Sequence, residues 1–453
     1  MTVNIVPVIK FLNNRRIKNI IGNLSIFVRE SKIQAMTVVK VFCFGLLDIP
    51  NASLRQIASK MEDVQGGIKL TRQAVFKKLS QCVELLKEVF KLAIEYSMAV
   101  CESLESDYIS GITDFSDIIL CDSTFITLPD KLRSIWKGPG GKRGVKSSLK
   151  IQTMYSLFSR TIKKFELFKG AGADTEYKDN IVNYVNEGML VVTDLGYFAR
   201  GFFRAIETNN AYYLSRLRNK TIVHIENSGG KLIQIPNLFR ILKGKNVGNT
   251  VDKEIWIGAR YTKQLKCRLI AIKIPTEVAN ERIRKAKKAS KKTLSSYEIE
   301  LLRWNILITN APKEMLSVEA ACALYRLRWQ IELLFKACKS YLNIDKVGQC
   351  GAAQLECIIY GRLIAAVIVF GFYAVLYPWY YIRYNKQISM LCFFSVICSK
   401  STLMLEIIFG KQGALVSFLK RIAQNSFYEK RTRKNSMEVF LLYYGREFFQ
   451  KTG

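Results

Sequence analysis

The sequence predicts an α/β protein with a mixed-sheet core, a mostly β insertion within that core, and a helical domain at each end. Apolar residues recur at three- and four-residue intervals near both ends of the chain, as they do in helices that bury one face. Between these parts, short runs rich in Ile, Val and Thr alternate with helical segments, as in a sheet covered by helices. With 453 residues, the chain is long enough for more than one domain.

The N-terminal domain, residues 1–110, is predicted to be helical and to bind DNA. Its apolar spacing is clearest from Ser31 to Leu47 and from Leu70 to Val100. Ser53 and Thr71 each precede a helical pattern and are suited to cap it. Polar and basic residues lie on the exposed face of the second of these helices: Arg72, Gln73, Lys77 and Lys78. The pair is either a helix-turn-helix that reads DNA or an ordinary helical hairpin.

The core, residues 111–220 and 304–345, begins with a strand-like run from Asp117 to Leu128. Two more strands follow in a predicted antiparallel meander, and then a helix, a strand, a helix and a strand. This order is typical of a sheet of ribonuclease-H type, so we predict a ribonuclease-H-like core. In that topology the first and fourth strands lie side by side.

Residues 221–303 are predicted to form an insertion domain of β strands and one basic helix. From Arg282 to Lys292 that helix has seven basic residues and no acid. This pattern fits either a solvated helix face or a face that contacts phosphates. The C-terminal domain, residues 346–453, is predicted to be helical, with basic patches at Lys420–Arg421 and Lys430–Lys434.

One apolar segment, from Leu363 to Ile382, has twenty residues without a charge, which is enough to span a bilayer. Pro378 and a cluster of Tyr and Trp lie near one end, and strongly polar sequence follows. We therefore predict a buried core helix and no membrane partner, with a membrane-associated basic protein as the competing interpretation.

The charge of the chain points to a polyanionic partner. The chain has 69 Lys and Arg residues but 37 Asp and Glu residues, which gives a net charge of +32. An excess of this size repels itself unless a polyanion neutralises it, and its spread along the chain favours nucleic acid over anionic membrane. The eleven cysteines form no CxxC pair and lie mostly in apolar runs, which indicates free thiols in a reducing cytosol.

The single histidine, His224, limits the chemistry that is open to the chain. It excludes paired-histidine metal sites and histidine-rich nuclease sites, and it leaves one candidate for a Ser-His-Asp triad. We interpret it as a polar residue in a strand. An enzyme with this composition that acts on nucleic acid would have to use carboxylates.

Two carboxylates are placed for such chemistry. Asp122 lies in the middle of the first predicted strand, where an acid is costly unless it is paired, hydrogen-bonded or bound to a metal. Asp194 ends the fourth predicted strand, before a loop with Gly196. If the two strands are neighbours, these carboxylates meet, and a divalent cation would relieve their repulsion.

A third feature is the long helix predicted to begin near Ser317, which includes residues 324–342. Tyr325, Arg328, Glu332 and Lys339 are spaced by three, four and seven positions, which places them on one stripe of a continuous helix. A surface helix with ion pairs is the simpler explanation of this stripe. An apolar face is expected elsewhere on the helix, made by Trp329, Leu333, Leu334 and Ala337.

The runs CDST, TDLGYF and YRLRWQIELLFKACK resemble the motifs of DDE transposases in the insertion-sequence-four branch. The resemblance implies that Asp122, Asp194 and Glu332 are catalytic and bind two divalent cations, Mg²⁺ or Mn²⁺. It implies DNA-backbone contacts for Tyr325, Arg328 and Lys339. Trp256, in the insertion, is a candidate for stacking on a displaced base, with a core tryptophan as the alternative.

The function implied by this resemblance is a transposase that cuts DNA at the ends of an insertion sequence and joins the freed 3′ ends to target DNA by two-metal phosphoryl transfer. Its partners would be double-stranded DNA, at transposon ends and at the target, and a second copy of the chain on paired ends. The expected location is the bacterial cytoplasm, associated with the nucleoid. The alternative is a catalytically inactive DNA-binding protein derived from a transposase.

Overall fold

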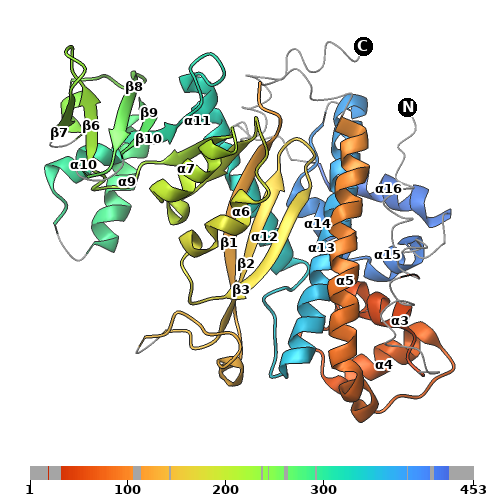
Figure 1. The fold of residues 1–453 in the computed structure, drawn as a ribbon. Coiled ribbons are helices and arrows are strands. Elements are labelled where there is room, and N and C mark those ends of the chain that lie inside the picture. The colour runs from red at the N-terminus through yellow and green to blue at the C-terminus, as the bar shows by residue number, and fades with distance from the viewer. Residues whose placement is uncertain are drawn as a thin grey trace. The chain divides into compact units, whose positions relative to one another are not determined.

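The fold is seen in a computed structural model, drawn in Figure 1. The structure describes Asn19 and residues 32–427, except for short gaps at 106–113, 142–143, 236–237, 243, 260–263, 291–292, 385 and 409–412. The expectations for residues 1–31, for Lys291–Lys292 and for the basic patch Lys430–Lys434 lie outside the described residues.

The described residues form two compact units. The first unit contains residues 32–105, 122–172 and 330–427, and the second contains residues 114–121 and 173–329. One boundary falls inside strand β1 (Ile118–Thr127), between Cys121 and Asp122. Each unit is therefore described by itself.

The first unit is mainly helical. Its helices are α3 (Ala35–Lys40), the π-helix η1 (Val41–Gly45), α4 (Leu54–Gln65), α5 (Arg72–Glu105), the short 3-10 helix η2 (Asp130–Leu132), α12 (Trp329–Ser340, from its second residue), α13 (Ala352–Tyr384), α14 (Met390–Cys398), α15 (Ser401–Ile408) and α16 (Gly413–Asn425).

Local sequence signals set the starts of α4 and α5, as predicted. Ser53 caps α4 through a capping box with Gln56, in which each side chain accepts a hydrogen bond from the other residue's backbone N–H. The hydroxyl of Thr71 accepts a hydrogen bond of 3.2 Å from the backbone N–H of Ala74 at the start of α5. The predicted pair of helices is thus confirmed, whereas its binding to DNA stays a prediction.

Helices α5 and α13 pack side by side (Figure 1). Lys87 and Glu356 form an ion pair of 3.2 Å between them. α13 also passes close to η1, because a Cβ at Gly361 would overlap the backbone of Phe42. Residues 352–377 of α13 are long and apolar enough to cross a membrane, with a mean hydropathy of 2.1, and 94% of the most apolar window is buried inside the protein. Burial of this kind is typical of a core helix, and the expectation of no membrane partner stays a prediction.

A three-stranded sheet completes the first unit, in the order β3-β2-β1. It consists of the second half of β1, β2 (Ser148–Ser156) and β3 (Ile162–Lys169), and β2 and β3 are antiparallel as predicted. The rings of Phe90 on α5 and Phe165 on β3 stack at 6.4 Å, which joins the helices to this sheet.

The second unit contains the strand order β1-β4-β5-β10-β9-β8-β6-β7. The strands are the first half of β1, β4 (Leu190–Thr193), β5 (Tyr212–Arg216), β6 (Val223–Glu226), β7 (Leu232–Ile235), β8 (Thr250–Ile257), β9 (Leu265–Lys273) and β10 (Trp304–Thr309). β1, β4 and β5 are parallel, and the other pairs are antiparallel. The predicted mixed α/β class and the predicted pairing of the first and fourth strands are confirmed.

The helices of the second unit are η3 (Asp174–Tyr177), α6 (Lys178–Val182), η4 (Leu195–Tyr197), α7 (Arg200–Thr208), α8 (Phe239–Leu242), α9 (Thr276–Ala289), α10 (Ser296–Leu302) and α11 (Val318–Leu327). The prediction of a single basic helix in the insertion is wrong in one respect. The predicted helix is divided into two, because α9 ends at Ala289 and α10 begins at Ser296. Ser295 begins α10 with its own capping box. The strands of the insertion add to the sheet through β9, which pairs with β10.

Candidate active site

Asp194 lies directly after β4, as predicted, and its carboxylate shapes the turn that follows. Its Oδ1 accepts a hydrogen bond of 2.7 Å from the backbone N–H of Gly196, which caps η4. A side chain at position 196 would collide, since a Cβ there would lie 2.6 Å from Oδ2 of Asp174 and 3.0 Å from Oδ1 of Asp194. The glycine therefore lets two carboxylates approach one tight turn.

Two arginines that were not expected at the site lie at the end of β5 and just beyond it. Thr193 of β4 and Ser215 of β5 are Cα partners in parallel register, so Asp194 and Arg216 each come directly after a paired residue. Arg218 donates a hydrogen bond of 3.1 Å from Nη2 to the carbonyl of Leu195. The signal in the sequence was the run SRLR at the end of a strand that neighbours the Asp194 strand.

Tyr325 on α11 lies within the electrostatic reach of this strand end. The guanidinium carbon of Arg216 is 5.4 Å from the centre of the Tyr325 ring. Burial raises the pKa of the Tyr325 hydroxyl, the charges of Arg216 and Arg328 lower it, and that of Asp194 raises it. Arg328 also hydrogen-bonds Tyr325. The second unit thus gathers Asp194, Tyr325 and Arg328, three of the predicted site residues, around Arg216.

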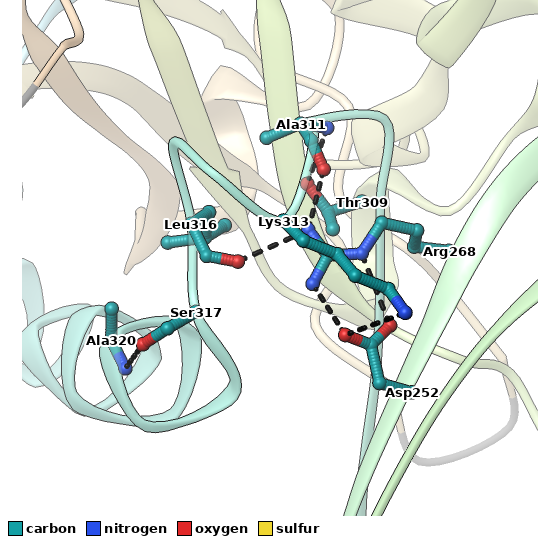
Figure 2. Close-up of polar contacts among 8 residues, drawn as sticks. All are labelled: Asp252, Arg268, Thr309, Ala311, Lys313, Leu316, Ser317 and Ala320. Carbon is teal, nitrogen blue, oxygen red and sulfur yellow. Dashed lines mark hydrogen bonds and ion pairs between the residues drawn. The ribbon is translucent and has the colours of Figure 1, made fainter.

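A buried arginine fixes the segment that leads into α11. Figure 2 shows Arg268 of β9 donating to the carbonyls of Ala311 and Leu316, at 2.6 and 3.0 Å. Its Nε and Nη2 atoms bind both carboxylate oxygens of Asp252, at 3.1 and 2.8 Å. Directly after this segment, the Ser317 hydroxyl accepts from the N–H of Ala320 and caps α11, as predicted for a helix beginning near Ser317. The sheet therefore holds the start of the helix that carries Tyr325.

Asp122 belongs to the first unit and is half-buried in β1. Its Oδ1 accepts a hydrogen bond of 2.8 Å from the N–H of Ser123. The preceding residue, Cys121, is the Cα partner of Thr193 in the parallel pairing of β1 with β4. Cys121 and Thr193 are therefore paired in neighbouring strands, and each of them is followed directly by an aspartate, Asp122 or Asp194.

Glu332 and Lys339 lie in the first and last turns of α12, and both are half-buried. The helix is interrupted at Arg328, between α11 and α12, although Arg328 keeps right-handed helical dihedrals. The single stripe of Tyr325, Arg328, Glu332 and Lys339 stays a prediction, because its members divide between the two units.

The apolar face of α12 differs from the expectation at one position. Leu334 and Ala337 are buried as predicted and Leu333 is half-buried, whereas Trp329 is 54% exposed. The buried residues of α12 follow Ile331 at helical spacing, and Trp329 falls outside that face. Trp329 is therefore an exposed aromatic beside Arg328 and not a core residue.

The donor set for a metal consists of carboxylates. Oxygen ligands of this kind suit Mg²⁺ and Mn²⁺, so the chemistry of Asp122, Asp194 and Glu332 fits the predicted cations. Within the described ranges, no group of three or more His, Cys, Asp or Glu side chains is already arranged to hold a metal ion.

The predicted DNA-contacting residues of the N-terminal helices are accessible to differing degrees. Arg72 and Lys77 on α5 are exposed, and Lys78 is half-buried. Phe76 lies on the same face and is 64% exposed, a feature that the sequence analysis did not single out. This face of α5 therefore combines two cations with an exposed ring.

The insertion residues are placed as follows. His224 is buried in β6, as interpreted, with Nε2 of Gln264 3.1 Å from its Nδ1. Trp256 is half-buried, and the Lys266 ammonium lies 5.4 Å from its ring centre.

In the basic helix α9, Arg282 donates to Asn305 at 2.8 Å, while Arg284 and Lys285 both pair with Glu281. These three cations thus have partners within the protein.

Known proteins resemble this chain over most of its length. A family model described as "Transposase DDE domain" matches residues 113–368. The transposase for insertion sequence element IS1151 of Clostridium perfringens is 28% identical over 356 residues, which cover 75% of this chain and 74% of that protein. The transposase for insertion sequence element IS231F of Bacillus thuringiensis subsp. israelensis is 28% identical over 359 residues, covering 75% and 73%. Among solved structures, a piggyBac transposase synaptic complex with hairpin DNA aligns with a TM-score of 0.46 and 10% identity over 96% of this chain and 88% of that one.

Proposed function

Because the chain belongs to the transposase DDE domain family, whose match covers more than half of it, we propose that it cuts DNA at the ends of an insertion sequence and joins the freed 3′ ends to target DNA. Asp122, Asp194 and Glu332 are the proposed catalytic residues. The proposed frame is a ribonuclease-H-like core, with the parallel strands β1, β4 and β5 at its centre.

One observation supports this proposal most directly. The parallel pairing of β1 with β4 has Cys121 opposite Thr193, and an aspartate follows each of these residues. Ligands bind at the carboxyl ends of parallel strands, where such residues converge. Glu332 supplies the third carboxylate from the first turn of α12, where the helix dipole favours a negative charge.

The three carboxylates are the proposed ligands of two divalent cations, Mg²⁺ or Mn²⁺. When bound, such cations supply the Lewis acidity that activates an attacking hydroxyl and stabilises the leaving oxygen. The protein's own part is to hold the carboxylates in place. The N–H of Gly196 orients Asp194, and the N–H of Ser123 orients Asp122.

The side chains proposed to bind DNA have a separate role. Tyr325, Arg328 and Lys339 are proposed to bind the DNA backbone next to the cut, and Arg72, Lys77 and Lys78 to bind DNA through α5. A guanidinium and an ammonium match phosphate oxygens in charge, and the net charge of +32 suits a polyanionic substrate.

The reaction needs no energy source. Hydrolysis breaks one phosphodiester bond at each end and leaves a 3′-hydroxyl. That hydroxyl then attacks a target phosphodiester, so that one bond forms as another breaks, without a covalent protein–DNA intermediate. Because both ends have to be cut together, we propose a homodimer on paired ends, acting in the bacterial cytoplasm on nucleoid DNA.

Cleavage of a labelled transposon-end duplex tests the proposal. Wild-type protein and Glu332→Gln are compared with Mg²⁺, with Mn²⁺ and with a chelator. We expect nicking at the end only with the cations and only with wild-type protein, while both proteins bind the duplex. Binding without cutting by either protein would instead identify an inactive DNA-binding derivative of a transposase.

A further inference from the structure

A cavity of about 360 Å³ lies within the first unit. Three segments line it: residues 51–55 at the start of α4, Arg72 at the start of α5, and residues 348–358 at the start of α13. The first and last of these segments are nearly three hundred positions apart in the sequence. None of the proposed catalytic residues lines this cavity.

Buried hydrogen bonds hold the walls of the cavity together. Arg362, which is 2% exposed, donates to the carbonyls of Pro50, Asn343 and Lys346 at 2.5, 2.7 and 3.1 Å. Gln354 donates to the carbonyl of Ala52 at 2.9 Å. The cavity is therefore built into the fold and does not depend on a ligand to form it.

The lining contains two arginines and no carboxylate. Arg55 and Arg72 have exposed side chains, and neither forms an ion pair with any residue that the structure describes. Burial raises the pKa of the Cys350 thiol, and the charges of Lys131 and Arg362 lower it, so further cations lie near the lining. Asp345 offsets the charge of Arg362, since it raises the pKa that burial lowers to about 10. The charge that remains in the cavity is positive.

The start of α13 lies next to this lining, between Cys350 and Gln354. α13 begins after Gly351, which has no side chain to cap the first turn, and a Cβ at Gly351 would meet open space. The first N–H groups of this 33-residue helix have no partners within the helix, and they carry its positive dipole end. Arginine side chains and helix amides are the groups that bind phosphate oxygens.

We propose that this cavity binds a backbone phosphate of duplex DNA, with Arg55 and Arg72 as its ligands. This inference rests on the proposed function and adds a DNA contact to it. Arg72 is the first residue of the exposed face of α5 that also contains Phe76 and Lys77. A duplex whose phosphate is bound in the cavity would therefore lie along that face. The helical pair α4–α5 thereby becomes a DNA-binding element that includes the start of α13.

The test is the salt dependence of DNA binding, measured in a chelator so that no cutting occurs. Arg55→Gln and Arg72→Gln are compared with wild type on a labelled duplex of random sequence. The slope of log affinity against log salt should fall by about one unit for each variant and about two for the pair. Arg55→Lys and Arg72→Lys, which keep the charge, should restore the wild-type slope.

Lys91→Gln is the matched control. Lys91 lies on α5, about 28 Å beyond Arg72 along the helix, and pairs with Glu88 at 2.6 Å. Its slope should equal that of wild type. Wild-type slopes in both Arg→Gln variants would overturn the phosphate site and the DNA contact proposed for Arg72. They would leave the catalytic proposal standing, because cleavage of the transposon end tests it independently. A wild-type protein that binds no duplex would overturn both.

Discussion

The guanidinium of Arg216 lies 5.4 Å from the ring centre of Tyr325, which connects the end of β5 to α11. Asp194 belongs to the same group, because its charge raises the pKa of Tyr325 while that of Arg216 lowers it. The ends of β4 and β5, where the proposed metal ligand Asp194 lies, are thus close to α11, which carries the proposed DNA ligand Tyr325.

Arg216→Gln is expected to slow cleavage of bound DNA by about tenfold. The change removes a cation–ring contact worth about 1 kcal/mol and a positive charge beside the proposed catalytic strand end. Single-turnover cleavage at saturating protein measures the effect apart from binding. Lys220→Gln, an exposed cation shortly after β5, is the control and should cut at the wild-type rate.

Asp194→Asn is expected to keep DNA binding and to lose cleavage by roughly a thousandfold or more, as for a residue that is essential to the reaction. Asparagine can still accept the hydrogen bond from Gly196, so the turn should survive while the charge is lost. The exposed Asp179, on α6, provides the control Asp179→Asn. Persistent cleavage by Asp194→Asn would show that the second acid is wrongly assigned.

Lys339→Ala is expected to lower DNA affinity and to reduce the salt slope by about one unit, because one phosphate contact is lost. Binding of a transposon-end duplex at several salt concentrations measures this. Lys400→Ala removes an exposed cation after α14 and should leave the slope unchanged. An unchanged slope in Lys339→Ala would rule out its phosphate contact.

Arg268→Met is expected to lower the free energy of unfolding of the second unit by about 3–5 kcal/mol. The substitution leaves the half-buried carboxylate of Asp252 without its two-point partner and frees the carbonyls of Ala311 and Leu316 (Figure 2). Urea unfolding followed by hydrogen exchange in this unit measures the loss. Lys313→Met is the control, since Lys313 is 59% exposed and 3.9 Å from Asp252, and it should change stability by less than about 1 kcal/mol.

Phe76→Ala is expected to weaken DNA binding by about tenfold, while changing the free energy of unfolding by less than about 0.5 kcal/mol. The ring is 64% exposed, so its removal leaves no cavity in the core. Equilibrium binding and thermal unfolding of the same preparation separate the two effects. Tyr184→Ala, which removes a ring that is 50% exposed on the second unit, should bind DNA as wild type does.

Much of the local structure could be predicted from the sequence. Ser53, Thr71 and Ser317 cap helices through hydrogen bonds to residues three positions away, so the signal is contained in a few neighbouring residues. The strands around Asp122 and Asp194 are apolar runs that end at turn residues. Their parallel pairing followed from the order of elements, because only a few sheet topologies fit that order.

Other features depended on residues far apart in the chain. Arg216 met Tyr325 only through the packing of α11 near the end of β5, and Trp329 proved exposed because the buried face of α12 follows Ile331. The strands of the insertion joined the sheet through β10, which the alternation of apolar residues could not show. Alternation identifies a strand, whereas its neighbour depends on long-range hydrogen bonds.

The sequence by itself determined the class of fold, the helix starts, the candidate acids and the excess of positive charge, since each depends on composition or on contacts between near neighbours. The tertiary structure alone decided which cations gather. Arg55 and Arg72 share a cavity with the start of α13 because Arg362 holds two segments together that are nearly three hundred residues apart. Contacts over that distance form only when the whole core packs, and no local pattern encodes them.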